Sequence, residues 1–175
     1  SIEDVHAVVE REMTATIRRQ AKRLDPSLPA ILACHVSLND YLVHDNPGSE
    51  QWMTLGTAPT LMKSALPVEY DYVALGHHHC NMDLKAEMPC WYSGSMQRVD
   101  FGEEGQPKGF MVLDIDPDRP RGSRIGGSGL PRLVEVPARK FLTIDVAPEA
   151  DDPTAEVVAA CSEADADDAI VKVEV

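Results

Sequence analysis

Three consecutive histidines, His77, His78 and His79, directly follow an apolar segment that ends at Gly76. Imidazole nitrogens are common ligands of zinc, manganese and iron, so a histidine run at the end of an apolar strand is a candidate metal site. Residues i and i+2 of an extended strand face the same side of a sheet. We therefore predict that His77 and His79 converge as metal ligands. His78 is expected to point outward or to support the ligands without binding the metal itself.

His35 ends a second apolar run, "PAILACHV" at residues 29–36. If the two runs form neighbouring strands of one sheet, His35 is the natural third ligand, with carboxylates completing the coordination of the ion. Two alternatives stay open. Each histidine can instead be an ordinary hydrogen-bonded side chain. His79 can also join Cys80 and Cys90 in a zinc site, although that cysteine spacing lacks the usual knuckle geometry.

Several apolar segments that end in polar clusters must position these histidines. An amphipathic helix is predicted from residue 2 to about residue 24, where Asp25-Pro26 ends it. Residues 29–36 and 70–76 are predicted to be buried strands. Further strands are expected within residues 90–95 and 109–116, a short helix at 61–66, and a loop over 36–60. This order predicts an α/β layered domain over residues 1–116, with its site at the strand ends.

The remainder of the chain changes character. Residues 117–131 are rich in Pro, Gly, Arg and Ser and are predicted to be a linker. Residues 132–175 then offer strand material, a helix that starts with an acidic, proline-containing turn, and an alternating segment at the C-terminal end. This pattern predicts a small β-α-β portion of a second domain.

The charge is unevenly distributed. The formal net charge is −13, but residues 145–175 contain ten acidic residues and one basic residue. Six bases lie between residues 119 and 140, against one acid, so the total charge does not exclude a DNA partner. The candidate phosphate-contacting residues are Arg98, Arg121, Arg124 and Arg139. The alternatives are a solvated linker for the last three and a salt bridge with Asp100 or Glu103 for Arg98.

The chain has no stretch of about 18 apolar residues and does not open on a signal peptide. We therefore expect a cytoplasmic protein without a membrane segment. Its four scattered cysteines are expected to be reduced thiols.

Three segments resemble the SbcD-type DNA repair exonucleases of the calcineurin-like metallophosphoesterase superfamily. They are "HVS" after an apolar strand, "YDYVALGHHH", and "CWYSGSMQRVDFGEEGQPKGFMVLDID". In that family the corresponding pieces are a lone histidine, a GHxH motif and a YxGS...R.DF.E...KG segment. GHxH is shared by the whole superfamily, and the segment from Tyr92 to Gly109 is what points to the nuclease branch. The resemblance extends from about Ile31 to the C-terminal end.

The resemblance implies a layered αββα sandwich followed by the beginning of a DNA-capping domain. It also implies two Mn²⁺ ions that hydrolyse phosphodiester bonds, with His35 and His77 on one ion and His79 on the other. An SbcC-type coiled-coil ATPase and a second copy of the nuclease are the implied protein partners, and DNA is the implied substrate. No catalytic residue beyond these ligands is assigned.

The GDxxD and GNH motifs of that family do not occur in the chain. We therefore expect the chain to contain the C-terminal half of the catalytic domain and part of the cap. Weak metal binding and no hydrolysis by this polypeptide alone follow from that expectation. Two other functions stay open, namely a metallophosphoesterase for small phosphoesters or nucleotides, and a non-catalytic scaffold module.

Overall fold

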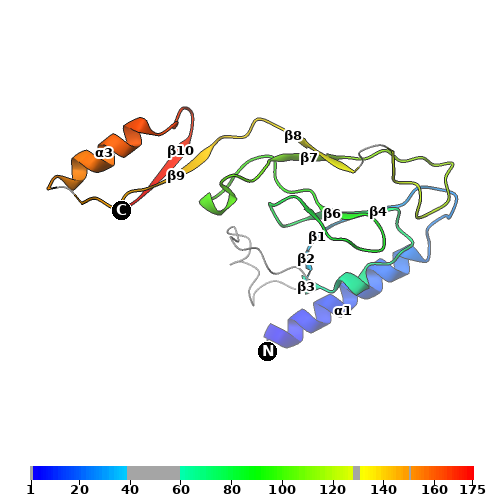
Figure 1. Ribbon diagram of the computed structural model, residues 1–175. Coiled ribbons are helices and arrows are strands. Elements are labelled where there is room, and N and C mark those ends of the chain that lie inside the picture. The colour runs from blue at the N-terminus through cyan, green and yellow to red at the C-terminus, as the bar shows by residue number, and fades with distance from the viewer. Residues whose placement is uncertain (1, 39–59, 128–130, 150) are drawn as a thin grey trace.

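The computed structural model describes residues 2–38, 60–127, 131–149 and 151–175. Most of the predicted loop over residues 36–60 lies outside these ranges. The described residues form a mixed α/β structure, with two α-helices, one four-stranded sheet and three two-stranded sheets (Figure 1). The α/β class expected from the sequence is thus confirmed.

The four-stranded sheet determines where the histidines lie. Its strand order is β1 (Ile31–His35), β4 (Tyr72–Gly76), β6 (Cys90–Tyr92) and β5 (Met82–Asp83). β1, β4 and β6 are parallel, and β5 runs antiparallel to β6. His35 pairs in register with Gly76. Because parallel strands share one carboxyl-terminal edge, His35 and His77 meet at that edge.

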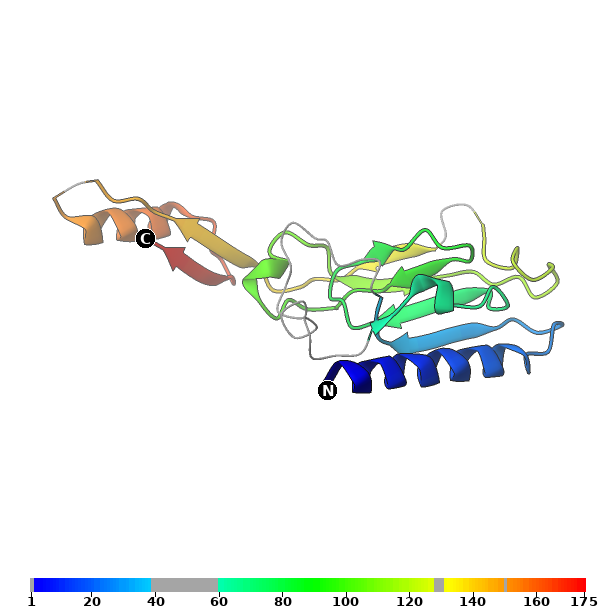
Figure 2. The same ribbon diagram turned by 90° about the horizontal axis from the view of Figure 1, so that it is seen from below.

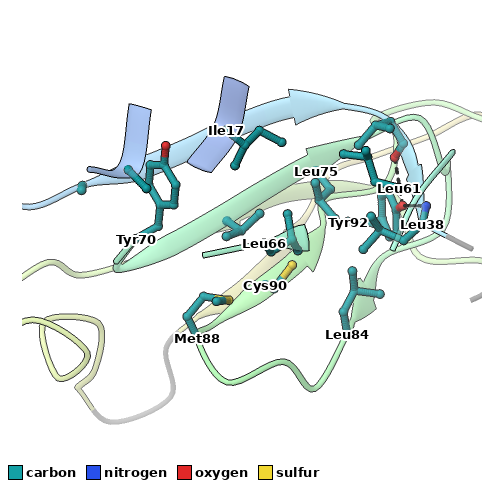
Figure 3. Packing of buried hydrophobic residues seen from close by; sticks show 14 residues of the cluster. Ile17, Leu38, Leu61, Leu66, Tyr70, Leu75, Leu84, Met88, Cys90 and Tyr92 are labelled. Carbon is teal, nitrogen blue, oxygen red and sulfur yellow. Dashed lines mark hydrogen bonds between the residues drawn. The ribbon is translucent and has the colours of Figure 1, made fainter. Parts of the chain in front are cut away.

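Helix α1 (Ile2–Ala21) packs on this sheet through Ile17 and Ala21. The core also contains residues of β2 (Ser37–Leu38), β3 (Thr60–Leu61) and the segment after η2 (Lys63–Ala65), as Figure 3 shows. The predicted helices at residues 2–24 and 61–66 are therefore found, the second as a short 3₁₀ turn. β4 is buried as expected, but β1 is not. β1 is an edge strand among the described residues, with Ile31 48% exposed.

Strand β7 (Gly109–Val112) pairs antiparallel with β8 (Arg132–Glu135). The pairing joins residues on either side of the predicted linker at 117–131, so that segment is the connection within one strand pair. Within this connection, Ile115 and Ile125 form an isolated antiparallel bridge, which brings its two ends together. Residues 132–135 therefore pair with the first predicted domain rather than with the C-terminal strands.

The C-terminal unit consists of β9 (Phe141–Asp145), α3 (Pro153–Glu163) and β10 (Ile170–Glu174). β9 and β10 are parallel, with α3 as the crossover, so the predicted β-α-β arrangement is confirmed. The Asp152 side chain accepts a hydrogen bond from the Ala155 amide at 3.1 Å and caps α3. Figure 2 shows this unit at one end of an elongated molecule.

Candidate metal centre

His35 and His77 lie against one another at the carboxyl-terminal edge of the sheet. Their ring centroids are 5.5 Å apart in an edge-to-face arrangement. Gly76 makes room for this contact, since a Cβ at that position would lie 2.9 Å from Nδ1 of His35. His77 itself has a φ of +108°, a conformation that a non-glycine residue rarely adopts. Backbone strain of this kind is concentrated at functional sites.

The strand-alternation argument for His77 and His79 is wrong in its geometry. β4 ends at Gly76, so the three histidines follow the strand rather than extend it. The positive φ of His77 departs from the extended geometry that strand alternation requires. His78 is only 8% exposed, so the expectation that it points outward is wrong, while the alternative that it supports the ligands stays a prediction. Its Nε2 lies 3.2 Å from the Ser37 hydroxyl, and its ring packs edge-on against Tyr92.

His79 is held by a carboxylate. Its Nδ1 lies 2.8 Å from Oε1 of Glu103, and the Glu103 side chain is fully buried. A neutral imidazole that donates from Nδ1 carries its lone pair on Nε2. Histidines that bind metals in proteins nearly always make this second hydrogen bond, which fixes the ring and its tautomer. In that tautomer, the lone pair of His79 lies on Nε2, as it does in histidines that bind metals through this atom.

Glu103 also forms a buried ion pair with Lys108. Oε2 of Glu103 lies 2.6 Å from the Lys108 ammonium nitrogen, and both side chains are 0% exposed. The same ammonium donates to the His79 carbonyl at 3.0 Å and to the Ser95 hydroxyl at 3.0 Å. Glu103 therefore orients the His79 ring while Lys108 fixes its backbone. No role for this pair follows from the sequence alone, where the one signal is its place inside the "DFGEEGQPKG" segment.

Tyr92 supports the histidines from beneath. Burial raises the pKa of its hydroxyl well above the usual range, so the group stays protonated. The hydroxyl donates to the Val36 carbonyl at 2.9 Å and accepts from the Leu38 amide at 3.0 Å (Figure 3). These bonds hold the chain directly after His35 against β6.

The structure does not support a zinc site built on Cys80 and Cys90. Cys90 is 0% exposed in the hydrophobic core, and burial raises its thiol pKa to about 12. A thiolate is the form that binds zinc, and this environment disfavours it. Cys80 instead directs its thiol to the Asn81 carbonyl at 3.5 Å.

The donor set fits the imidazole half of a divalent-metal site. Two rings meet at the sheet edge, and a third has the carboxylate support that is typical of metal-binding histidines. No group of three or more histidine, cysteine or carboxylate side chains within the described ranges is arranged to hold an ion. Asp4 and His6 form an Asp-x-His pair, but both lie within helix α1 rather than after a strand. Carboxylate ligands for this centre are therefore not found in the part of the chain that the structure describes.

Arg98, a predicted DNA-contacting residue, donates hydrogen bonds to four backbone carbonyls. They belong to Glu103 at 3.2 Å, Gln106 at 2.7 Å, Ala138 at 3.5 Å and Arg139 at 3.0 Å. These four contacts are with carbonyls, whereas the alternative expected from the sequence is a salt bridge with the carboxylate of Asp100 or Glu103. The guanidinium ties the loop after η3 (Phe101–Glu103) to the segment before β9.

Arg124 is 4% exposed, and its guanidinium faces the protein interior. It lies 3.3 Å from the fully buried carboxylate of Asp71 and donates to the carbonyls of Leu28 and Pro26 at 2.7 and 2.8 Å. These contacts fasten the predicted linker to the loop after α1. The structure therefore gives Arg124 an internal role, and a DNA contact through it receives no support.

Arg139 is exposed, whereas Arg121 is half-buried and its Nε atom is buried. One guanidinium nitrogen of Arg121 donates to the Asp25 carbonyl at 2.8 Å. Arg139 pairs with the exposed Asp168 at 3.2 Å. Exposed pairs of this kind contribute little to stability and exchange partners at small cost. Contacts of Arg121 and Arg139 with phosphates stay predictions.

A search against models of known protein families found no match to this chain. In the portion that the structure describes, neither helix has the length and apolar character that crossing a lipid bilayer requires.

Proposed function

We propose that this chain supplies the histidine ligands of a divalent-metal centre in a DNA-cleaving phosphodiesterase of SbcD type. The observation that carries the proposal is the meeting of His35 and His77 at one sheet edge, with His79 held nearby in the chain by buried Glu103. The segment from Tyr92 to Gly109, which resembles the nuclease branch, contributes Glu103 and Lys108, both of which contact His79.

On this proposal, the four-stranded sheet and α1 are part of a layered αββα sandwich, and the C-terminal unit is the start of a DNA-capping domain. The parallel β1-β4-β6 order supports the first assignment, because ligand sites of such sheets lie at the carboxyl-terminal edge. The assignment of the capping domain is supported by the β-α-β unit, which follows the sheet in the chain and lies at one end of the molecule.

His35 and His77 would hold one Mn²⁺ ion and His79 the other, with carboxylate ligands contributed from outside the residues that the structure describes. Two such ions orient water, neutralise the phosphate and stabilise the leaving oxygen of a phosphodiester. The residues of this chain prepare the site for that chemistry. Glu103 fixes the ring of His79, Lys108 balances the charge of Glu103, and Gly76 admits the ring of His35.

Duplex DNA is the proposed substrate, and the proposed phosphate contacts are Arg139, whose side chain is 56% exposed, and the half-buried Arg121. By the same resemblance, we propose a homodimer and an SbcC-type coiled-coil ATPase as partners. These two partners rest on the resemblance alone.

The test is Mn²⁺-dependent hydrolysis by the polypeptide of the complete reading frame that contains this chain. Linear duplex DNA, a nitrophenyl phosphodiester and a nucleotide are compared as substrates. We expect cleavage from duplex ends, and a loss of about 100-fold or more in His77→Ala, since removing even a supporting partner of a metal ligand costs 10–100-fold. His6→Ala, on α1, is the matched control and should retain activity. Hydrolysis of small phosphoesters alone would favour a general phosphoesterase, and no hydrolysis would favour a scaffold.

A further inference from the structure

The short 3₁₀ turn η3 carries two consecutive glutamates, Glu103 and Glu104, whose side chains contact different parts of the molecule. Asp100 caps it, since its side chain accepts a hydrogen bond from the Gly102 amide at 2.7 Å. Backbone hydrogen bonds from Glu104 to Phe101 and from Gln106 to Glu103 close the turn at 3.2 and 3.1 Å. These bonds fix the directions of two consecutive glutamates. In Figure 2 the turn lies between the sheet and the C-terminal unit.

The first glutamate faces the histidines. Glu103 contacts the His79 ring at 2.8 Å and Lys108 at 2.6 Å, and its side chain has no exposed surface. A carboxylate buried between two fixed partners has little freedom to move independently of the turn that bears it. A displacement of η3 would therefore also displace the His79 ring.

The second glutamate faces the C-terminal unit. The Glu104 carboxylate accepts hydrogen bonds from the Thr143 amide at 3.0 Å and from the Thr143 hydroxyl at 2.7 Å, both on β9. Beside this contact, the rings of Phe101 and Phe141 pack with centroids 4.9 Å apart. Phe141 is 8% exposed, so the contact between these two rings is a buried contact between η3 and the C-terminal unit.

We infer that Glu104 is a positioning residue for His79, and that the C-terminal unit sets the orientation of this ring through η3. The chain of contacts runs from Thr143 to Glu104, along the turn to Glu103, and on to Nδ1 of His79. A shift of the C-terminal unit relative to the sheet moves η3, because Glu104 and Phe101 contact Thr143 and Phe141 on β9. The inference rests on the proposed function only where it concerns metal affinity, since the coupling itself is present without a metal.

The experiment compares Glu104→Ala with Glu104→Gln and with Glu163→Ala, which removes an exposed carboxylate from α3 of the same unit. Two quantities are measured in the 175-residue chain at neutral pH. One is the solvent exchange rate of the His79 Nδ1 proton, observed by NMR without metal. The other is the dissociation constant for Mn²⁺, followed through the His79 ring signals. The thermal midpoint serves to show that each variant is folded.

For Glu104→Ala we expect proton exchange at His79 that is about tenfold faster and Mn²⁺ affinity that is about threefold to tenfold weaker, a smaller effect than removal of a direct partner. Glu104→Gln keeps one acceptor for Thr143 and should recover part of both effects, and Glu163→Ala should change neither. Unchanged exchange at His79 in folded Glu104→Ala overturns the inference. If exchange responds but Mn²⁺ leaves the His79 signals unaffected in the unaltered chain, the coupling stands and the proposed metal centre fails.

Discussion

Replacing Lys108 with methionine is expected to lower the free energy of unfolding by about 3–5 kcal/mol, the cost of leaving one member of a buried ion pair alone. The reason is that the carboxylate of Glu103, whose side chain has no exposed surface, loses its cationic partner. His79 and Ser95 lose a hydrogen-bond donor in the same variant. The measurement is urea unfolding followed by circular dichroism.

Two further variants make this result specific. Glu103→Gln combined with Lys108→Met removes both charges and should recover most of the loss, because no uncompensated charge then stays buried. Lys85→Met is the matched control, since Lys85 is 80% exposed and pairs with Asp83 at the surface. Exposed pairs are worth about 0–1 kcal/mol. A Lys108→Met protein as stable as Lys85→Met would contradict the buried arrangement.

Replacing Arg124 with methionine is expected to cost about 3 kcal/mol of stability, near the lower end of the range for breaking a buried pair. Asp71 would lose its cation but would keep hydrogen bonds from the Ala30 amide at 2.9 Å and the Gly122 amide at 3.3 Å. The loop after α1 would also lose the donor that holds the carbonyls of Pro26 and Leu28. Urea unfolding measures the loss, and Asp71→Asn combined with Arg124→Met should recover part of it.

The same variant separates an internal role from a DNA contact. If Arg124 faces the interior, folded Arg124→Met should bind duplex DNA with an unchanged dependence on salt. Loss of one phosphate contact instead reduces the slope of log affinity against log salt by about 1. A stable Arg124→Met protein with that reduced slope would contradict the buried position. Arg139→Met, at an exposed site, is the matched comparison.

Local pattern predicted the elements of this fold well. The helical spacing of α1, the apolar runs of β4 and β6, and the β-α-β order of the C-terminal unit are all present. The approach of His35 to His77 was also predictable, because both end apolar strands and parallel neighbours share an edge. These features depend on residues close in sequence or on one pairing rule.

Features set by long-range contacts were not predictable. The turn at His77 depends on packing that sends His78 toward Ser37 and Tyr92, which no spacing rule reveals. Arg124 lies in a segment with a linker-like composition, yet it is buried in an ion pair with Asp71, more than fifty residues earlier in the chain. Glu103 and Lys108 are charged residues that composition assigns to the surface. Only the three-dimensional arrangement shows that they orient His79.

A Mn²⁺ titration observed by NMR tests most directly whether His35 and His77 bind one divalent ion and His79 a second. Mn²⁺ is paramagnetic and broadens the signals of nuclei close to it. The account predicts that the ring signals of His35, His77 and His79 broaden at lower Mn²⁺ concentration than those of His6, which lies on α1. Ring signals that keep their widths, or that broaden together with His6, would contradict the claim.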